Sequence, residues 1–206
     1  MKKTSLLITI LFLINFISQA QNLDCLRVFS DAQISIANTA QNTTYLSLQE
    51  KNILLILNLA RLYPVLFNNE IIDNYNGIVG YPNDFLKNKK YIRSLSKTLL
   101  RMDPIKELHP SYDLYLLAYC HAYKSGLKGR VGHKRVGCDK LGQTHSECCS
   151  YGLEYALDIV VQLLIDHNIK NLGHRNIMLD ANQSILGVSI QPHKGYRVNA
   201  VLDFSY

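Results

Sequence analysis

Several familiar patterns are missing from this sequence of 206 residues. It has no internal repeat and no low-complexity tract, which excludes a repeat architecture. The HExxH signature of zinc proteases is absent. There is no tryptophan, and basic residues are not interleaved with aromatic ones as in many nucleic-acid-binding proteins. Nucleic acid is therefore not an expected partner.

The first twenty residues have the pattern of a secretory signal peptide. Lys2 and Lys3 precede an apolar run over 6–17, and Ser18-Gln19-Ala20 supplies a small-x-small cleavage site. The apolar run is short for a membrane-spanning helix. We therefore expect a signal peptide over 1–20, a secreted or periplasmic protein, and no transmembrane segment after cleavage.

The remaining chain, residues 21–206, has the length of a single domain with one core. Residues 21–46 are polar and weakly patterned, which predicts an extended lead-in or a short helix before a domain over 47–206. The formal charge of +6 becomes 6 − 2 = +4 without the two signal-peptide lysines. Basic side chains on solvent-exposed surfaces account for this excess of positive charge. The alternative is that they bind an anionic surface such as lipid headgroups or glycan.

The order of predicted elements indicates an α+β fold. Ser47 and Glu50 form a capping box that predicts the start of a helix, which Pro64 ends. Further helical patterns follow, and the chain closes with predicted strands over 186–190 and 198–204. We expect helices packed on a small, mainly antiparallel sheet.

Five cysteines in an oxidising compartment predict disulfides with one thiol left over. Cys138 lies close in sequence to the vicinal pair Cys148 and Cys149, so we expect a bridge from Cys138 to one of them. Cys120, within an apolar helix, is interpreted as a buried small hydrophobe. Cys25 has no assigned partner, and the connectivity is not deducible from the sequence.

Two histidines and two acidic residues are candidates for a shared site. His133, Glu147 and His174 are each expected in a polar, glycine-containing loop beside a helix, and Asp166 ends a long apolar helix shortly before His174. Imidazoles and carboxylates are the ligands that zinc requires, and the same groups can act as general acid and base. The alternative is that each histidine braces its own loop.

The remaining candidates have structural interpretations. His121, on an apolar helix face, is interpreted as a core histidine. His109 and His193 are expected to be exposed, and Arg175 is expected to pair with a carboxylate or with carbonyls of its own turn.

Residues 48–206 resemble the CAP superfamily, which comprises cysteine-rich secretory proteins, antigen 5 and plant pathogenesis-related proteins, in its short bacterial form with an SCP domain. The residues that carry the resemblance are Asn58-Leu59-Ala60-Arg61, Leu114 to His121, Gly132-His133, Glu147, Gly173-His174-Arg175-Asn176-Ile177-Met178, Leu186-Gly187-Val188 and Tyr196 to Phe204.

The resemblance implies an α-β-α sandwich whose cleft holds two histidines and two acids able to bind a divalent metal such as zinc. By position, His133 and His174 match the histidines and Glu147 matches the first acid, so these three are the metal-ligand candidates. Asp166 is the candidate for the second acid, which makes the cleft His133, Glu147, Asp166 and His174.

The function expected from the resemblance is a secreted binding or interaction module with no established catalysis. Its ligand would be a lipid, a sterol or a cell-surface molecule. One alternative is a zinc-dependent hydrolase in which Glu147 is the general base. Another is a cysteine hydrolase that uses Cys148 or Cys149 with a histidine.

Overall fold

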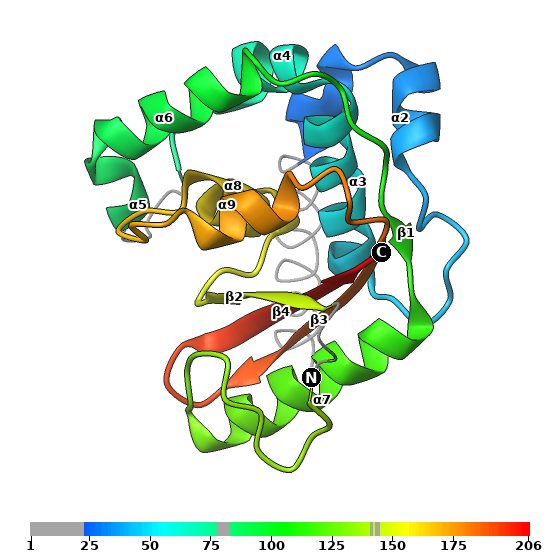
Figure 1. Cartoon of the computed structure of the whole chain (residues 1–206), viewed down its shortest axis with the longest axis vertical. Helices are drawn as coiled ribbons and strands as arrows, with labels where there is room; N and C mark the ends of the chain where they lie inside the picture. Colours follow the sequence, from blue (N-terminus) through cyan, green and yellow to red (C-terminus); the bar gives the residue numbers. More distant parts are fainter. Residues whose placement is uncertain (1–22, 78–82, 141, 143–144) are drawn as a thin grey trace, which may run out of the picture.

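The computed structural model describes residues 23–77, 83–140, 142 and 145–206, and the predicted signal peptide lies outside them. Within these ranges, eight α-helices pack on an open four-stranded sheet that is mixed but mostly antiparallel (Figure 1). The prediction of an α+β fold with helices on a small, mainly antiparallel sheet is confirmed. No helix in the described ranges is both long enough and apolar enough to cross a membrane.

The helices are distributed along the whole described chain. They are a 3-10 turn η1 (Cys25–Val28), α2 (Asp31–Ala37), α3 (Leu48–Leu62), α4 (Pro64–Phe67), a π-helical turn η2 (Asn68–Ile72), α5 (Asp84–Lys87), α6 (Lys89–Leu99), α7 (Tyr112–Lys128), α8 (Ala156–Ile165) and α9 (Gly173–Met178). The strands are β1 (His109–Pro110), β2 (Ser146–Tyr151), β3 (Ile185–His193) and β4 (Arg197–Ser205).

The sheet has the strand order β1-β3-β4-β2, so β2 is an edge strand. Strands β3 and β4 form the expected terminal hairpin, with Ile185 opposite Ser205 and His193 opposite Arg197. The expectation that Glu147 lies in a loop was wrong, because it belongs to strand β2. Glu147 instead pairs across the ladder with Asp203 of β4, which fixes the face of the sheet on which it lies.

Side-chain alternation along the strands gives the sheet two buried faces. Ala200, Leu202 and Phe204 of β4 join the large core under α3 and α8, whereas Val201 lies with Ala118 of α7 in a smaller cluster. Helix α7 therefore covers one face and α3 and α8 cover the other (Figure 1). The contact between α7 and β3 is tight, because a Cβ on Gly187 would lie 2.1 Å from the carbonyl carbon of Leu114.

Helix α3 fastens distant segments together through buried polar side chains. Its capping box is present as predicted: the backbone amide of Glu50 donates to Ser47 Oγ, and the backbone amide of Ser47 donates to Glu50 Oε2 at 2.7 Å. Asn58 donates to the carbonyls of Ala37 and Leu108 and accepts from the Leu108 amide. The guanidinium of Arg61, which has no exposed surface, donates to four carbonyl oxygens, those of Lys106, Met178, Asp180 and Gln183.

The predicted lead-in packs into the same core as the rest of the chain. It contains η1 and α2, and Leu26, Phe29 and Ala37 are buried against core residues of α3 and η2. Burial of these three side chains explains why a polar, weakly patterned segment becomes ordered, since each removes apolar surface from water.

A disulfide is present, as predicted, but the expected pairing was wrong. Cys120 of α7 is bridged to Cys138, with their Cα atoms 5.8 Å apart, whereas Cys148 and Cys149 are free thiols. The bridge ties the loop after α7 back to the helix. The reason is geometric: Cys148 and Cys149 lie within β2, whose alternation sends their side chains into two different buried layers.

The expectation that His193 is exposed was also wrong. Only 3% of His193 is accessible, because its imidazole closes the β3–β4 turn. Its Nδ1 atom accepts from the amides of Gly195 and Tyr196, and its Nε2 atom bonds the carbonyl of Arg130 at 2.9 Å. His109 is exposed, as predicted.

Candidate functional site

The first half of the candidate site is a histidine–carboxylate pair beside α7. His133 belongs to the loop after α7, and Glu147 is the second residue of β2. The Nδ1 atom of His133 and Oε1 of Glu147 are 2.7 Å apart. The Glu147 side chain is buried, whereas 59% of the His133 side chain is exposed, so the imidazole projects from a buried anchor toward solvent.

The second half is a matching pair on the opposite face of the sheet. Asp166 ends α8 in a left-handed backbone conformation, with φ of 55°, and its carboxylate reaches the start of α9. Its Oδ1 is 2.7 Å from Nδ1 of His174, and its Oδ2 accepts from the backbone amide of His174 at 3.0 Å. Asp166 therefore both orients the imidazole and binds free amides at a helix start.

The two pairs meet around the edge of strand β2. The ring centroids of His133 and His174 are 6.3 Å apart. His174 and Asp166 line a cavity of about 870 Å³ that also includes Cys149. His133 and Glu147 line a second cavity of about 590 Å³. The structure thus brings together all four residues named from the sequence, His133, Glu147, Asp166 and His174.

Arg135 links Glu147 to a second buried carboxylate that sequence reasoning did not identify. Its Nη2 atom forms an ion pair with Oε2 of Glu147 and lies 2.6 Å from both carboxylate oxygens of Asp203. Glu147 and Asp203 are direct cross-strand neighbours, so their like charges would repel without this guanidinium. The Asp203 side chain is fully buried, and 5% of the Arg135 side chain is exposed.

This arrangement shifts the pKa values of Glu147 and Asp203 in opposite directions. Burial raises the pKa of Glu147, but the hydrogen bond to His133 and the charge of Arg135 outweigh it, so the net pKa is lowered. For Asp203, burial dominates over the attraction of Arg135 and raises the pKa to about 7. The hydrogen bond to Glu147 raises the pKa of His133, since it favours the imidazolium.

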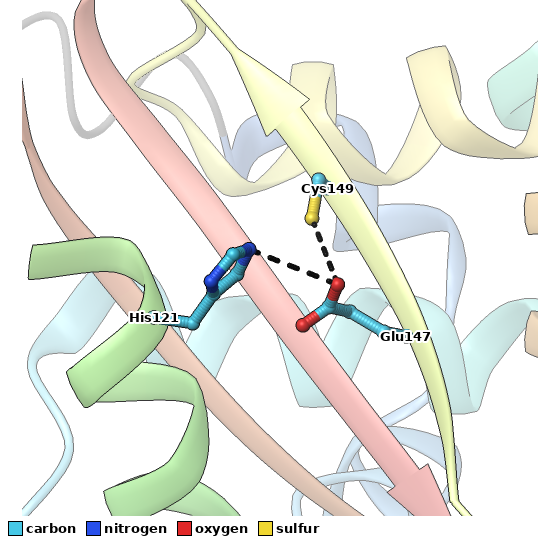
Figure 2. A group of neighbouring side chains, drawn as sticks. All are labelled: His121, Glu147 and Cys149. Atoms are coloured by element: carbon cyan, nitrogen blue, oxygen red, sulfur yellow. Dashed lines mark hydrogen bonds and ion pairs between the residues drawn. The ribbon is translucent and has the colours of Figure 1, made fainter. Parts of the chain in front are cut away.

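A further histidine and a thiol lie against Glu147 from inside the molecule. His121 of α7 and Cys149 of β2 point toward the Glu147 carboxylate, as Figure 2 shows. One ligand atom from each of these three residues lies within 4.8 Å of the other two, and all three residues are buried. The group could hold a metal ion. The expectation that His121 is a core histidine agrees with its burial but overlooks these neighbours.

Other residues near the site are structural. Arg175 donates to the carbonyls of Leu164, Ile165 and Tyr91 and to Ser94 Oγ, which anchors α9 on α8 and α6. Arg175 thus pairs with carbonyls, but they belong to α8 and α6, and the expectation that they belong to its own turn was wrong.

Neither vicinal thiol is in the state that a nucleophile requires. Burial raises the pKa of Cys148 and of Cys149 well above the ordinary value for a thiol. Both thiols are therefore protonated at neutral pH, which disfavours a cysteine-hydrolase mechanism, because its nucleophile is a thiolate.

Comparisons with known proteins do not identify the chain: no family model, no curated protein and no solved structure matches it.

Proposed function

We propose that this chain is an exported binding module of the CAP type, whose cleft holds a divalent metal such as zinc between His133 and His174. One observation carries the proposal. Two histidines from opposite sides of the sheet approach each other, and each bonds a carboxylate through its Nδ1 atom. Bonding one ring nitrogen to a carboxylate fixes the tautomer and orientation of histidines that bind metal through the other nitrogen.

The separation of the rings fits a shared ion. A zinc ion lies about 2.1 Å from an imidazole nitrogen, so two rings on one ion have centroids roughly 5 to 6.5 Å apart. The observed 6.3 Å falls at the upper end of this range. His133 and His174 would hold the ion, with Glu147 and Asp166 orienting them. Bound there, the ion would supply a Lewis acid beside the two cavities that His174 and His133 line.

The layering supports the CAP-type assignment. Helix α7 on one face of the sheet and α3 and α8 on the other give the α-β-α order that the resemblance implies (Figure 1). Two of the residues that carry the resemblance, Asn58 and Arg61, are buried and donate hydrogen bonds to backbone carbonyls of other segments. Their role is therefore to hold the fold together.

The larger cavity suits an apolar ligand with a polar group. Apolar and aromatic side chains contribute much of its wall, including Phe85, Leu163, Ile169 and Tyr196, while His174 stands among them. A lipid or a sterol has this chemistry: its apolar body would occupy the cavity, and its polar end would lie beside the histidines.

Binding is favoured over hydrolysis because Glu147 is a poor base. Its Oε1 is bonded to His133 and its Oε2 to Arg135, and its pKa is lowered. A general base that activates water works best with a pKa near the working pH and a free lone pair directed at that water.

The test is zinc binding by the purified mature chain, measured by titration calorimetry and by thermal unfolding with and without zinc. We expect stoichiometric binding and a rise in the unfolding temperature, because a ligand that binds only the folded state stabilises it. His133→Ala and His174→Ala are each expected to weaken zinc binding by at least about tenfold, the lower bound for loss of even an outer partner of a metal site.

His109→Ala is the matched control, because His109 is exposed on β1 and the substitution should leave zinc affinity unchanged. Unaltered affinity in both His133→Ala and His174→Ala would overturn the proposed cleft. Esterase or peptidase turnover that zinc supports and Glu147→Gln abolishes would overturn the binding-module assignment in favour of the hydrolase.

A further inference from the structure

Three potential metal ligands converge on the side of the sheet covered by α7. The Nε2 atom of His121 lies 3.8 Å from Oε1 of Glu147, and the Sγ atom of Cys149 lies 3.5 Å from the same oxygen. Figure 2 shows the imidazole approaching from α7 while the carboxylate and the thiol project from the same face of β2. Glu147 and Cys149 are two residues apart, so strand alternation places both on this face.

The spacing of these atoms is close to that of ligands around one small ion. Zinc binds sulfur at about 2.3 Å and nitrogen or oxygen at about 2.0 to 2.1 Å, so tetrahedral ligand atoms are roughly 3.3 to 3.6 Å apart. The cysteine–glutamate separation of 3.5 Å fits without movement, and the histidine–glutamate separation of 3.8 Å needs a shift of a few tenths of an ångström. The ligand atoms of His121 and Cys149 lie within 4.8 Å of each other, so an ion would draw these two side chains together. His133 stands beside the group, with its Nδ1 atom 3.9 Å from Cys149 Sγ.

The local charges favour a divalent cation. Arg135 offsets one of the two carboxylates that it contacts, Glu147 and Asp203. Glu147, whose pKa is lowered, and a Cys149 thiolate would each supply one negative charge to the ion. Burial of a charged group is tolerated only when it is paired in this way.

The group borders both cavities. Cys149 lines the larger cavity and Glu147 lines the smaller one. The Nε2 atom of His121 bonds the carbonyl of Gly132 at 3.1 Å. An incoming ion would replace this contact and would share Oε1 of Glu147 with the Nδ1 atom of His133, which lies 2.7 Å from that oxygen.

We propose that Cys149, His121 and Glu147 form a thiolate-type metal site that is separate from the paired histidines of the cleft. The ion bonds Sγ of Cys149, Nε2 of His121 and Oε1 of Glu147, and the thiol proton leaves to solvent as the bond to sulfur forms. Sulfur and nitrogen ligands select zinc and cobalt over magnesium and calcium, which prefer oxygen ligands. Glu147 is the one residue that this site shares with the proposed cleft.

The test uses cobalt(II) as the probe, titrated into the mature chain with its Cys120–Cys138 disulfide intact. A cobalt–thiolate bond gives an intense near-ultraviolet charge-transfer band that cobalt bound to imidazole and oxygen alone does not give. We expect this band on titration with cobalt, its loss on addition of zinc, and its persistence in excess magnesium. Absence of the band from the wild-type chain overturns the proposal without any variant.

Two neighbouring cysteines provide a matched pair of variants. Cys149→Ser should abolish the band, whereas Cys148→Ser should retain it, because Cys148 is directed into the large core and its Sγ contacts the carbonyl of His174. A band that survives Cys149→Ser overturns the proposal. His121→Ala is expected to weaken cobalt binding at least about tenfold.

The cleft proposal is tested separately by His174→Ala. His174 is not a ligand of the buried site, so this variant should keep the charge-transfer band while losing the zinc affinity of the cleft. Loss of the band in His174→Ala would show that one site uses both sets of residues, and would overturn the separation proposed here.

Discussion

Replacing Arg135 with methionine removes the charge that holds two buried carboxylates together. Glu147 and Asp203 are cross-strand neighbours, and Arg135 contacts both. Two unit charges about 5 Å apart, the spacing of cross-strand neighbours, repel by roughly 3 kcal/mol at an effective dielectric of about 20. Removing one partner from a buried ion pair costs about 3 to 5 kcal/mol. We therefore expect Arg135→Met to lower the free energy of unfolding by about 3 to 5 kcal/mol at pH 8.

The stability that Arg135→Met loses should increase as the pH rises. In the wild-type protein the pKa of Asp203 is about 7, above its value in the unfolded chain. Its contribution to stability is thus fully present at low pH and disappears as the pH rises through 7. Without Arg135, the pKa of Glu147 should also rise above its unfolded value. The variant should then lose stability more steeply than the wild type between about pH 5 and pH 8.

The assay is urea unfolding followed by circular dichroism, which suits a chain with no tryptophan, in buffer containing a chelator. Arg130→Met is the control, because Arg130 is exposed in the same loop and its loss should change stability by less than about 0.5 kcal/mol. Arg135→Met/Asp203→Asn should recover part of the loss, since it removes one of the repelling charges. A difference from wild type below about 1 kcal/mol at pH 8, or one that does not vary with pH, would refute this reasoning.

Two further predictions concern the framework around the site. Arg61→Ala should lower the free energy of unfolding by about 4 kcal/mol, because it leaves four carbonyls without their charged donor. The control is Arg101→Ala, which removes an exposed side chain and should change that free energy by less than about 0.5 kcal/mol. Equal urea midpoints for the two variants would contradict the structural role of Arg61. Replacing Cys120 and Cys138 together with serine should lower the free energy of unfolding by about 3 kcal/mol, the chain-entropy value for a loop of this length. The measurement is urea unfolding, with Cys25→Ser as a control. An unchanged midpoint would show that the disulfide does not restrain the unfolded chain.

The parts of the fold that the sequence predicts are those governed by neighbours along the chain. The capping box of Ser47 and Glu50 is a contact between residues three apart, and the β3–β4 hairpin joins adjacent segments. Both follow from local patterns of polar and apolar residues. Asp166 was found for the same reason, because it ends an apolar helix only eight residues before the histidine that it orients.

The residues that sequence reasoning missed are related by topology. Arg135 and Asp203 are 68 residues apart, and they meet only because the last strand of the hairpin pairs with β2. One local signal was available. Asp203 interrupts the apolar run of β4 at a position whose neighbour, Leu202, is fully buried, and a carboxylate inside such a strand needs a cationic partner.

The vicinal cysteines show how one structural fact changes the chemistry assigned to a motif. In a loop, Cys148 and Cys149 would be equivalent candidates for a bridge to Cys138. In strand β2 they are not equivalent, because alternation places Cys148 in the large core and Cys149 beside Glu147 and α7. Cys138 is bonded to Cys120, so Cys149 remains a thiol next to a carboxylate and an imidazole. The position of Glu147 on an edge strand is therefore what connects the two proposed sites: its carboxylate orients His133 outside the sheet and faces His121 and Cys149 within it.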